Sequence, residues 1–180
     1  MLLRLSGFFR QVNEWAGRSA AWLTVVLVGI VCFDVVARKL FNFTKAWIMD
    51  LEWHLFALIF LMAAGYALQH DRHVRVDLFY DKFSKKDKAL TDFTGTLLFL
   101  IPWCVTVIIY SYSYALQSFR LNEGAAEPGG LPARYVIKFC IVAGTVLLLL
   151  QAIAVLIETG LVLFGKKEPE TEEKPPQELI

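Results

Sequence analysis

Charge is scarce in this sequence, and what is present is balanced. Charged residues make up 19% of the 180 positions, with 18 Lys and Arg against 17 Asp and Glu. Without an excess of basic residues there is no reason to expect a nucleic-acid partner. The composition is 57% hydrophobic and includes 14 Phe and 5 Trp, which is too apolar for an ordinary soluble domain. These proportions indicate a protein that lies in a lipid bilayer.

Cysteine is also sparse, and its positions argue against cysteine chemistry. Cys32, Cys104 and Cys140 lie within apolar runs and have no CxxC spacing, so we expect buried thiols rather than a disulfide framework or a metal site. The start of the chain lacks the short apolar core and small-residue cleavage site of a secretory signal peptide. The first long apolar run begins only near Ser19. We therefore expect the N-terminus to be retained and the first span to act as an uncleaved anchor.

Four apolar runs are long enough to cross a membrane. A helix needs about 20 apolar residues to span the hydrocarbon layer, and backbone amides at that depth must be satisfied within the segment, which favours helices. The sequence predicts an all-α membrane protein with a four-helix transmembrane domain over 19–165 and additional amphipathic interfacial helices. The predicted spans are 19–37, 47–68, 93–119 and 135–164.

The distribution of basic residues predicts the orientation. With four spans, both termini and the segment after the second span share one side, which carries twelve Lys and Arg against six on the other side. Because the cytoplasmic side of a membrane protein carries the excess of Lys and Arg, we expect both termini in the cytoplasm. The loop over 124–132, with three Gly and two Pro, would then face outward.

The segments outside the spans carry helical patterns of their own. Residues 1–18 place apolar side chains on one stripe with Arg4 and Arg18 opposite, which predicts an amphipathic interfacial helix, with a frayed polar tail as the alternative. A second surface helix is predicted over about 75–90, and Ser84 with Asp87 resembles a capping box that starts a new helix. The tail over 166–180 is rich in Glu and Pro, so we expect it to be disordered.

Ionisable residues in or beside the spans are candidate functional groups, because charge in a membrane is costly. Asp34 and Arg38 stand one helical turn apart, which predicts an ion pair at the membrane boundary. Asp50, Glu52 and His54 lie at the start of the second predicted span. We consider Arg38 and Glu52 the best candidates for contacts with another subunit. The alternative is that they are simply solvated at the boundary.

The sequence shows no pattern of an autonomous enzyme or carrier. His70, His73, Asp71 and Asp77 have a loose metal-ligand character, but their spacing matches no closed site, so we expect no metal and no cofactor. Secondary transporters usually contain internal repeats and pairs of broken helices near the bilayer centre. This chain has neither, and Pro102 is the only proline well inside a predicted span. Any role in transport would therefore require a larger partner.

Two strings resemble a known family of membrane subunits. The run from Leu51 to Leu68 is followed by His73-Val-Arg-Val-Asp77, and Glu127-Pro-Gly-Gly-Leu-Pro-Ala-Arg134 precedes the fourth span. Together they resemble the small membrane subunit, often called DctQ, of tripartite ATP-independent periplasmic (TRAP) transporters. The likeness extends from about residue 20 to residue 163.

This resemblance implies a role and a set of contact residues. In such a system a periplasmic protein captures an organic acid, and a large membrane subunit moves it inward with sodium while the small subunit packs on its static part. Carried over to this chain, the subunit-interface candidates are Asp34, Arg38, Glu52, His54, His73, Arg75 and Asp77. The sequence departs from the family pattern at Asp34, where Asn is common, at Lys39, where an aromatic residue is common, and in lacking an early proline in the fourth span.

The predicted function is that of the small permease subunit of a sodium-coupled TRAP transporter in the bacterial inner membrane. Its partners would be the large subunit, transiently the periplasmic binding protein, and membrane lipids; the loop variant suggests 2-oxo or hydroxy acids as substrates. One alternative is the membrane anchor of a respiratory oxidoreductase, which holds haem between histidines, although only His54 lies in a span. Another is a small autonomous exporter, which would need an acidic residue deep in a span.

Overall fold

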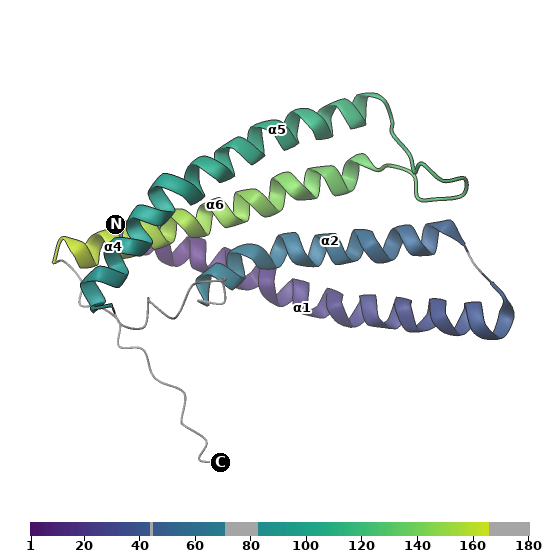
Figure 1. The fold of residues 1–180 in the computed structure, drawn as a ribbon, viewed down its shortest axis with the longest axis horizontal. Helices are drawn as coiled ribbons and strands as arrows, with labels where there is room; N and C mark the ends of the chain where they lie inside the picture. Colours follow the sequence, from purple (N-terminus) through teal and green to yellow (C-terminus); the bar gives the residue numbers. More distant parts are fainter. Residues whose placement is uncertain (44, 71–82, 166–180) are drawn as a thin grey trace, which may run out of the picture.

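The computed structural model describes residues 1–43, 45–70 and 83–165, and most of these residues lie in helices (Figure 1). The elements are α1 (Leu2–Phe41), α2 (Ala46–Gln69), α4 (Lys85–Gly95), the π-helix η1 (Thr96–Leu100), α5 (Ile101–Arg120) and α6 (Tyr135–Leu163). No strand occurs in these ranges. The predicted all-α class is confirmed.

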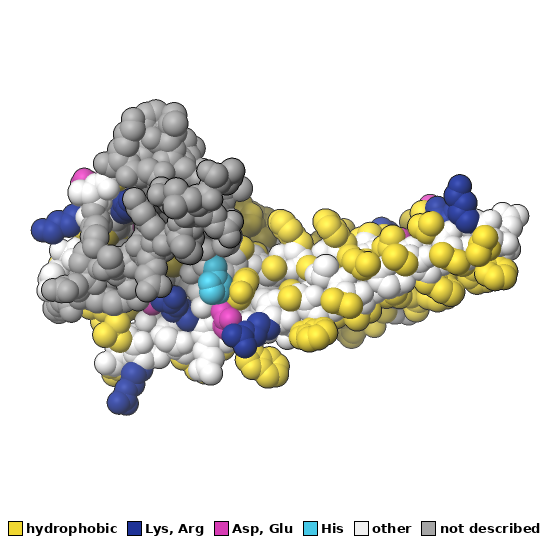
Figure 2. Space-filling view, turned by 90° about the horizontal axis from the view of Figure 1, so that it is seen from below, with side chains coloured by type: hydrophobic (Ala, Val, Ile, Leu, Met, Phe, Trp, Pro, Cys, Tyr) yellow, Lys and Arg dark blue, Asp and Glu magenta, His cyan; other side chains and the backbone are white. Residues whose placement is uncertain are grey.

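Four helical stretches have the length and composition of membrane spans. They are Leu2–Phe41, Ala46–Gln69, Lys86–Arg120 and Tyr135–Leu163. Helices α2 and α6 begin and end within one residue of the predicted spans. Apolar side chains cover most of the long body of the molecule on the face that carries α1, and charged side chains gather at its two ends (Figure 2). This distribution suits a bilayer, with the apolar middle in hydrocarbon and the charges near the headgroups.

Helix α1 differs from the prediction because it is one continuous helix of 40 residues. The predicted boundary between a surface helix over 1–18 and a span from residue 19 is not a break in the structure. The buried face of its first half consists of small and polar residues, namely Ser6, Asn13, Ala16, Gly17 and Ala20, while Phe8 and Trp15 of the predicted apolar stripe are exposed. Packing on neighbouring helices, rather than a surface position alone, therefore shapes this segment. Its depth in the membrane stays a prediction.

Helices α1, α2 and α6 form a closely packed core, and each contacts the other two. Glycines allow this approach. A methyl group at Gly65 of α2 would overlap the side-chain oxygen of Asn13 on α1 and lie 3.1 Å from the Leu147 carbonyl oxygen of α6, and one at Gly144 would lie 2.7 Å from the Leu61 Cβ. Side chains at these positions would force the helices apart. Ala, Gly and short polar residues thus replace large apolar residues between the helices, as is usual in membranes.

The α4–η1–α5 arm is arranged differently, because it packs mainly against α6. Its start is fixed by Ser84, whose hydroxyl oxygen accepts a hydrogen bond from the Asp87 N–H at 3.2 Å, so the predicted cap is confirmed. Pro102 is the second residue of α5, just after η1, and since proline has no N–H the α-helical hydrogen-bond pattern cannot run through it unchanged. Of the predicted surface helix over 75–90, residues 75–82 lie outside the described residues, and 85–90 belong to α4.

Candidate subunit-interface site

The predicted ion pair between Asp34 and Arg38 is present in the structure. The Arg38 guanidinium donates to the Asp34 carboxylate one turn before it on α1. Asp34 is only 1% exposed, whereas about half of the Arg38 side chain is exposed. The second carboxylate oxygen of Asp34 is buried and has no hydrogen-bond partner among the described residues. Arg38 therefore neutralises the buried charge from one side and leaves an acceptor available on the other.

Glu52 repeats this feature on the neighbouring helix. One of its carboxylate oxygens is buried and also lacks a partner within the described ranges. Asp34 and Glu52 lie at about the same level of the α1–α2 hairpin, since each is roughly two helical turns from the connection between the helices. We call Asp34, Arg38 and Glu52 the boundary cluster. Buried polar oxygens are nearly always hydrogen-bonded, so these two acceptors are left unsatisfied by the described residues, and the exposed half of Arg38 is the part of the cluster that another molecule can contact.

His54, in contrast, makes its contacts with neighbouring residues of this chain. Its Nδ1 lies 2.5 Å from the Asp50 carbonyl oxygen, and its ring centroid lies 4.0 Å from that of Trp53. The structure therefore gives His54 a local role on α2. The other three candidates, His73, Arg75 and Asp77, lie outside the described residues.

Asp50 has a role that the sequence did not reveal. Its carboxylate accepts hydrogen bonds from the Leu131 N–H at 2.9 Å and from the indole N–H of Trp53 at 3.1 Å. The Arg134 guanidinium lies 5.7 Å from the centre of the Trp53 ring, which adds a cation–π contact. Asp50 thus ties the loop between α5 and α6 to the start of α2. Residues 50 and 131 are 81 positions apart, so no local spacing could have predicted this bond.

A second cluster holds the other side of the same loop. The Glu123 carboxylate accepts from the Lys138 ammonium at 2.5 Å and from the Ser118 hydroxyl at 2.7 Å. Lys138 is buried, and its ammonium lies 3.8 Å from the centre of the Tyr114 ring. The bond from Lys138 and then that from Ser118 lower the pKa of Glu123 below its ordinary value. The loop is therefore fixed at both ends, with Glu127, Pro128 and Gly129 exposed at its tip.

At the opposite end, two groups of polar residues join elements distant in sequence. Arg10 of α1 pairs with Glu158 of α6 at 3.1 Å. Glu14 of α1 accepts from Arg18 at 3.0 Å and lies 2.9 Å from His70 Nε2, which follows α2. His70 is thus engaged by a carboxylate. Among the described residues no three His, Cys, Asp or Glu side chains gather as metal ligands would.

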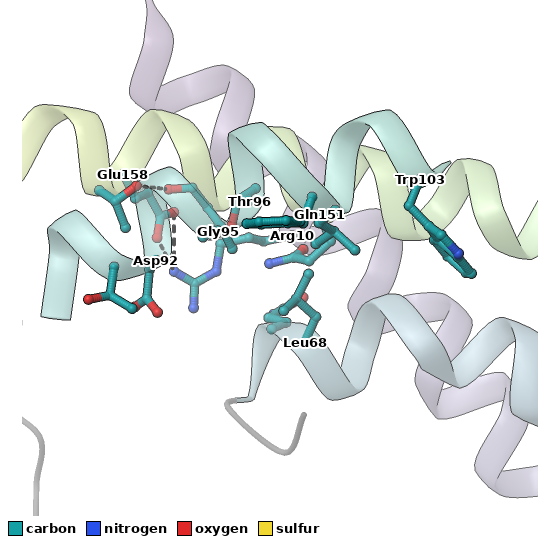
Figure 3. A pocket seen from close by; sticks show the side chains of 14 residues that line it. Arg10, Leu68, Asp92, Gly95, Thr96, Trp103, Gln151 and Glu158 are labelled. Carbon is teal, nitrogen blue, oxygen red and sulfur yellow. Dashed lines mark hydrogen bonds and ion pairs between the residues drawn. The ribbon is translucent and has the colours of Figure 1, made fainter. Parts of the chain in front are cut away.

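A cavity of about 670 Å³ lies beside the Arg10–Glu158 pair (Figure 3). It is lined by residues from α1, α2, α6 and the α4–η1–α5 arm. Among the described residues its lining includes three charged side chains, Arg10, Asp92 and Glu158, and Arg10 and Glu158 are paired with each other.

One protein-family model matches this chain. It is described as the DctQ component of tripartite ATP-independent periplasmic transporters, and the match covers residues 27–160, well over half of the sequence. The matched range contains the boundary cluster and both anchors of the α5–α6 loop. No curated protein matches the chain.

Proposed function

Since this chain belongs to the DctQ family of TRAP transporter components, we propose that it braces the static part of the large membrane component and binds no substrate itself. The family consists of transporter components rather than enzymes, and its members work with a large membrane component and a substrate-binding protein. The alternative of an oxidoreductase anchor is not supported by this membership. What remains to be assigned is the part this chain takes in transport.

The observation that carries the proposal is the distribution of polar groups along the helices. A substrate site in a transporter lies near the bilayer midplane and presents several polar groups and unwound backbone. In the described part of this chain, the ion pairs lie toward the helix ends, and the Arg10–Glu158 pair that lines the cavity of about 670 Å³ also lies toward one end. The four spans are therefore better suited to enlarging the membrane-embedded scaffold of the large component than to binding substrate.

Contact with the large component would use the boundary cluster. Asp34 and Glu52 each keep a buried acceptor without a donor from the described chain, and the exposed half of Arg38 offers additional donors. A partner carboxylate or carbonyl oxygen would accept from the exposed Arg38 guanidinium, whereas the two buried oxygens have almost no accessible surface for a partner atom. The exposed tip of the α5–α6 loop would lie on the periplasmic side, where the binding protein acts.

We also propose an orientation for this chain in the membrane and a substrate class for the assembled transporter. Both termini would lie in the cytoplasm, because the sequence segments predicted to share their side carry twelve Lys and Arg against six on the other side. The protein would act in the bacterial inner membrane. The assembled system would take up an organic acid, such as a 2-oxo or hydroxy acid, together with sodium.

Two measurements test this role. Calorimetry of the purified chain in lipid nanodiscs against 2-oxo, hydroxy and dicarboxylic acids should give no saturable heat. Vesicles that contain the large component and its binding protein should take up substrate with sodium only when this chain is present. Substrate binding by the isolated chain, or full uptake without it, would contradict the bracing role.

A further inference from the structure

One face of α5 points away from the rest of the bundle. Helix α5 packs mainly against α6, and Figure 1 shows it at one edge, with α6 between it and α2. Its buried residues are Cys104, Ala115 and Ser118, which therefore face α6. Thr106 precedes Ala115 by nine residues and Ser113 follows Cys104 by nine, which is about two and a half helical turns. Both hydroxyls thus lie on the opposite, outward face.

Polar side chains occupy this outward face of α5. Residues spaced four, three and four apart share one helical stripe, and on this face they are Thr106, Tyr110, Ser113 and Gln117, all exposed. We call these four residues the α5 polar stripe. The exposed side chains of α2 and α6 are apolar in comparison. They are Trp47, Met49, Trp53, Phe56 and Phe60 in α2, and Val136, Ala143 and Val146 in α6.

The stripe lies at the depth of the lipid acyl chains. The 20 residues of α5 extend about 30 Å, the thickness of the hydrocarbon layer, and the charged Arg120 ends the helix. Tyr110 lies ten residues before Arg120, about 15 Å along the axis. Helical side chains slope toward the N-terminus, so the Tyr110 hydroxyl points away from this boundary. Acyl chains offer no hydrogen bonds, so lipid cannot satisfy it.

Two members of the stripe have no hydrogen-bond partner for their side chains among the described residues. The Thr106 and Ser113 hydroxyls donate to carbonyl oxygens one turn before them, at 2.8 and 3.2 Å, and keep their lone pairs as acceptors. The Tyr110 hydroxyl and the Gln117 amide make no such bond. Tyr110 is 72% exposed, whereas the Tyr112 ring packs edge-on against an α6 ring with the centroids 6.4 Å apart. Only a molecule with polar groups of its own can pair these side chains in the membrane.

We propose that the α5 polar stripe is the contact face for one transmembrane helix of the large membrane component. This inference rests on the proposed function, which gives the chain a partner within the membrane. The partner helix presents small and hydrogen-bonding side chains, because these bring helices together in a bilayer. The Tyr110 hydroxyl donates to an acceptor on that helix, and the Thr106 and Ser113 hydroxyls accept from its donors. The small Ser113 side chain permits a close approach.

The α5 polar stripe and Arg38 of the boundary cluster contact separate segments of the large component in this arrangement. Figure 1 places the end of α5 near Arg120 and the end of α1 at opposite edges of the bundle. Arg38 lies in the last turn of α1, whereas the stripe extends through the hydrocarbon layer. Contacts at two edges would prevent this chain from rotating against its partner, which suits a brace.

Photochemical cross-linking in native membranes tests the contact. The full-length chain is coexpressed with the large component and carries benzoylphenylalanine at position 110 or at position 56. Phe56 is the matched control, because it is 65% exposed and lies ten residues from the end of α2 on the same side of the bundle. We expect at least tenfold more cross-linking to the large component from position 110. Equal yields, or a product from position 110 with lipid alone or with a second copy of this chain, would overturn the proposal.

Three substitutions measure the strength of the contact, by energy transfer between the labelled chain and the large component in liposomes. Tyr110→Phe removes only the hydroxyl and should weaken association about threefold, which corresponds to about 0.6 kcal/mol. Ser113→Phe prevents close approach and should weaken it about tenfold or more. Thr24→Phe is the control at an exposed α1 hydroxyl, which likewise donates to a carbonyl one turn before it at 3.1 Å, and should change nothing.

The same measurements separate this proposal from the bracing role. Each variant alone should keep the melting temperature of the unsubstituted chain, because all three side chains are exposed. If the chain binds the large component and neither stripe substitution weakens binding more than Thr24→Phe, the stripe is not the contact and the bracing role stands. If the unsubstituted chain does not associate with the large component, both proposals fail.

Discussion

The α1–α2–α6 core and the α4–η1–α5 arm differ in the number of helices that they contact. In the core, glycine and small or polar residues bring three helices into contact, and a methyl group at Gly65 has no room. The arm rests on α6 alone for most of its length and separates from α2, where the cavity forms. Small side chains between membrane helices thus let them approach closely, because lipid supplies no hydrophobic driving force for their association. The following changes test how far this division holds.

The largest effect is expected from Arg38→Ala in the core. This change leaves the Asp34 carboxylate, 1% exposed, without its cation. Breaking a pair with one buried member should lower the free energy of unfolding by about 3 kcal/mol, measured by denaturation in mild detergent. Asp34→Asn in the same background should recover most of the loss. Arg18→Ala, which breaks a pair whose Arg is 75% exposed, is the control and should cost less than about 0.5 kcal/mol.

Gly65→Ala should cause the second-largest loss of stability. The added methyl group overlaps Asn13, so α1 and α2 must move apart, at a cost of about 2 kcal/mol. Gly29→Ala adds the same methyl group to α1 where nothing lies within 4 Å, and its higher helix propensity should leave stability unchanged or slightly raised. Equal effects of the two substitutions would show that the core is not closely packed.

Asp50→Ala should release the α5–α6 loop from the start of α2. It removes the acceptor for the Leu131 N–H, a charge-assisted bond worth about 1.5 kcal/mol or more. Hydrogen exchange at the Leu131 amide should speed up about tenfold, while exchange in the middle of α6 stays slow. Glu127→Ala at the exposed tip of the loop provides the control. Unchanged exchange at Leu131 would mean that Asp50 does not hold the loop.

The smallest expected effect is the pH dependence of the second anchor. The pKa of Glu123 is lowered in the folded protein by the bonds from Lys138 and Ser118. Its contribution to loop stability is therefore fully present above the ordinary Glu pKa of about 4.3 and is lost as pH falls through the lower folded value. Exchange of the Arg134 amide, which donates to the Glu123 carbonyl oxygen at 2.8 Å, should accelerate only below about pH 4. Glu123→Gln should abolish this dependence.

The sequence predicted what depends on local composition. Helices α2 and α6 follow from uninterrupted apolar runs, since a backbone in hydrocarbon has few alternatives to a helix. The Asp34–Arg38 pair followed from its spacing of one turn. The bonds from the Leu131 N–H to Asp50 and from Arg10 to Glu158 join positions 81 and 148 residues apart. They depend on how the helices assemble, which spacing along one chain does not encode.

The continuity of α1 was missed for a related reason. The regular apolar stripe over 1–18 is typical of a helix lying on a membrane. The packing of α1 depends instead on a second face of the helix, which carries Ser6, Asn13 and Gly17. These small and polar side chains do not appear in a pattern of hydrophobic residues. Burial between helices selects for size, and a pattern of hydrophobicity cannot report it.

The unequal lengths of α1 and α2 impose a mismatch with any bilayer. At about 1.5 Å per residue, the 40 residues of α1 extend about 60 Å and the 24 residues of α2 about 36 Å, against a hydrocarbon thickness of about 30 Å. One membrane cannot match both helices upright, so α1 must lean or leave part of its length outside the acyl chains. Because Asn13 and Gly17 lock it to its neighbours, its tilt is set by the protein. The surrounding lipids, by stretching or thinning, must adapt to it.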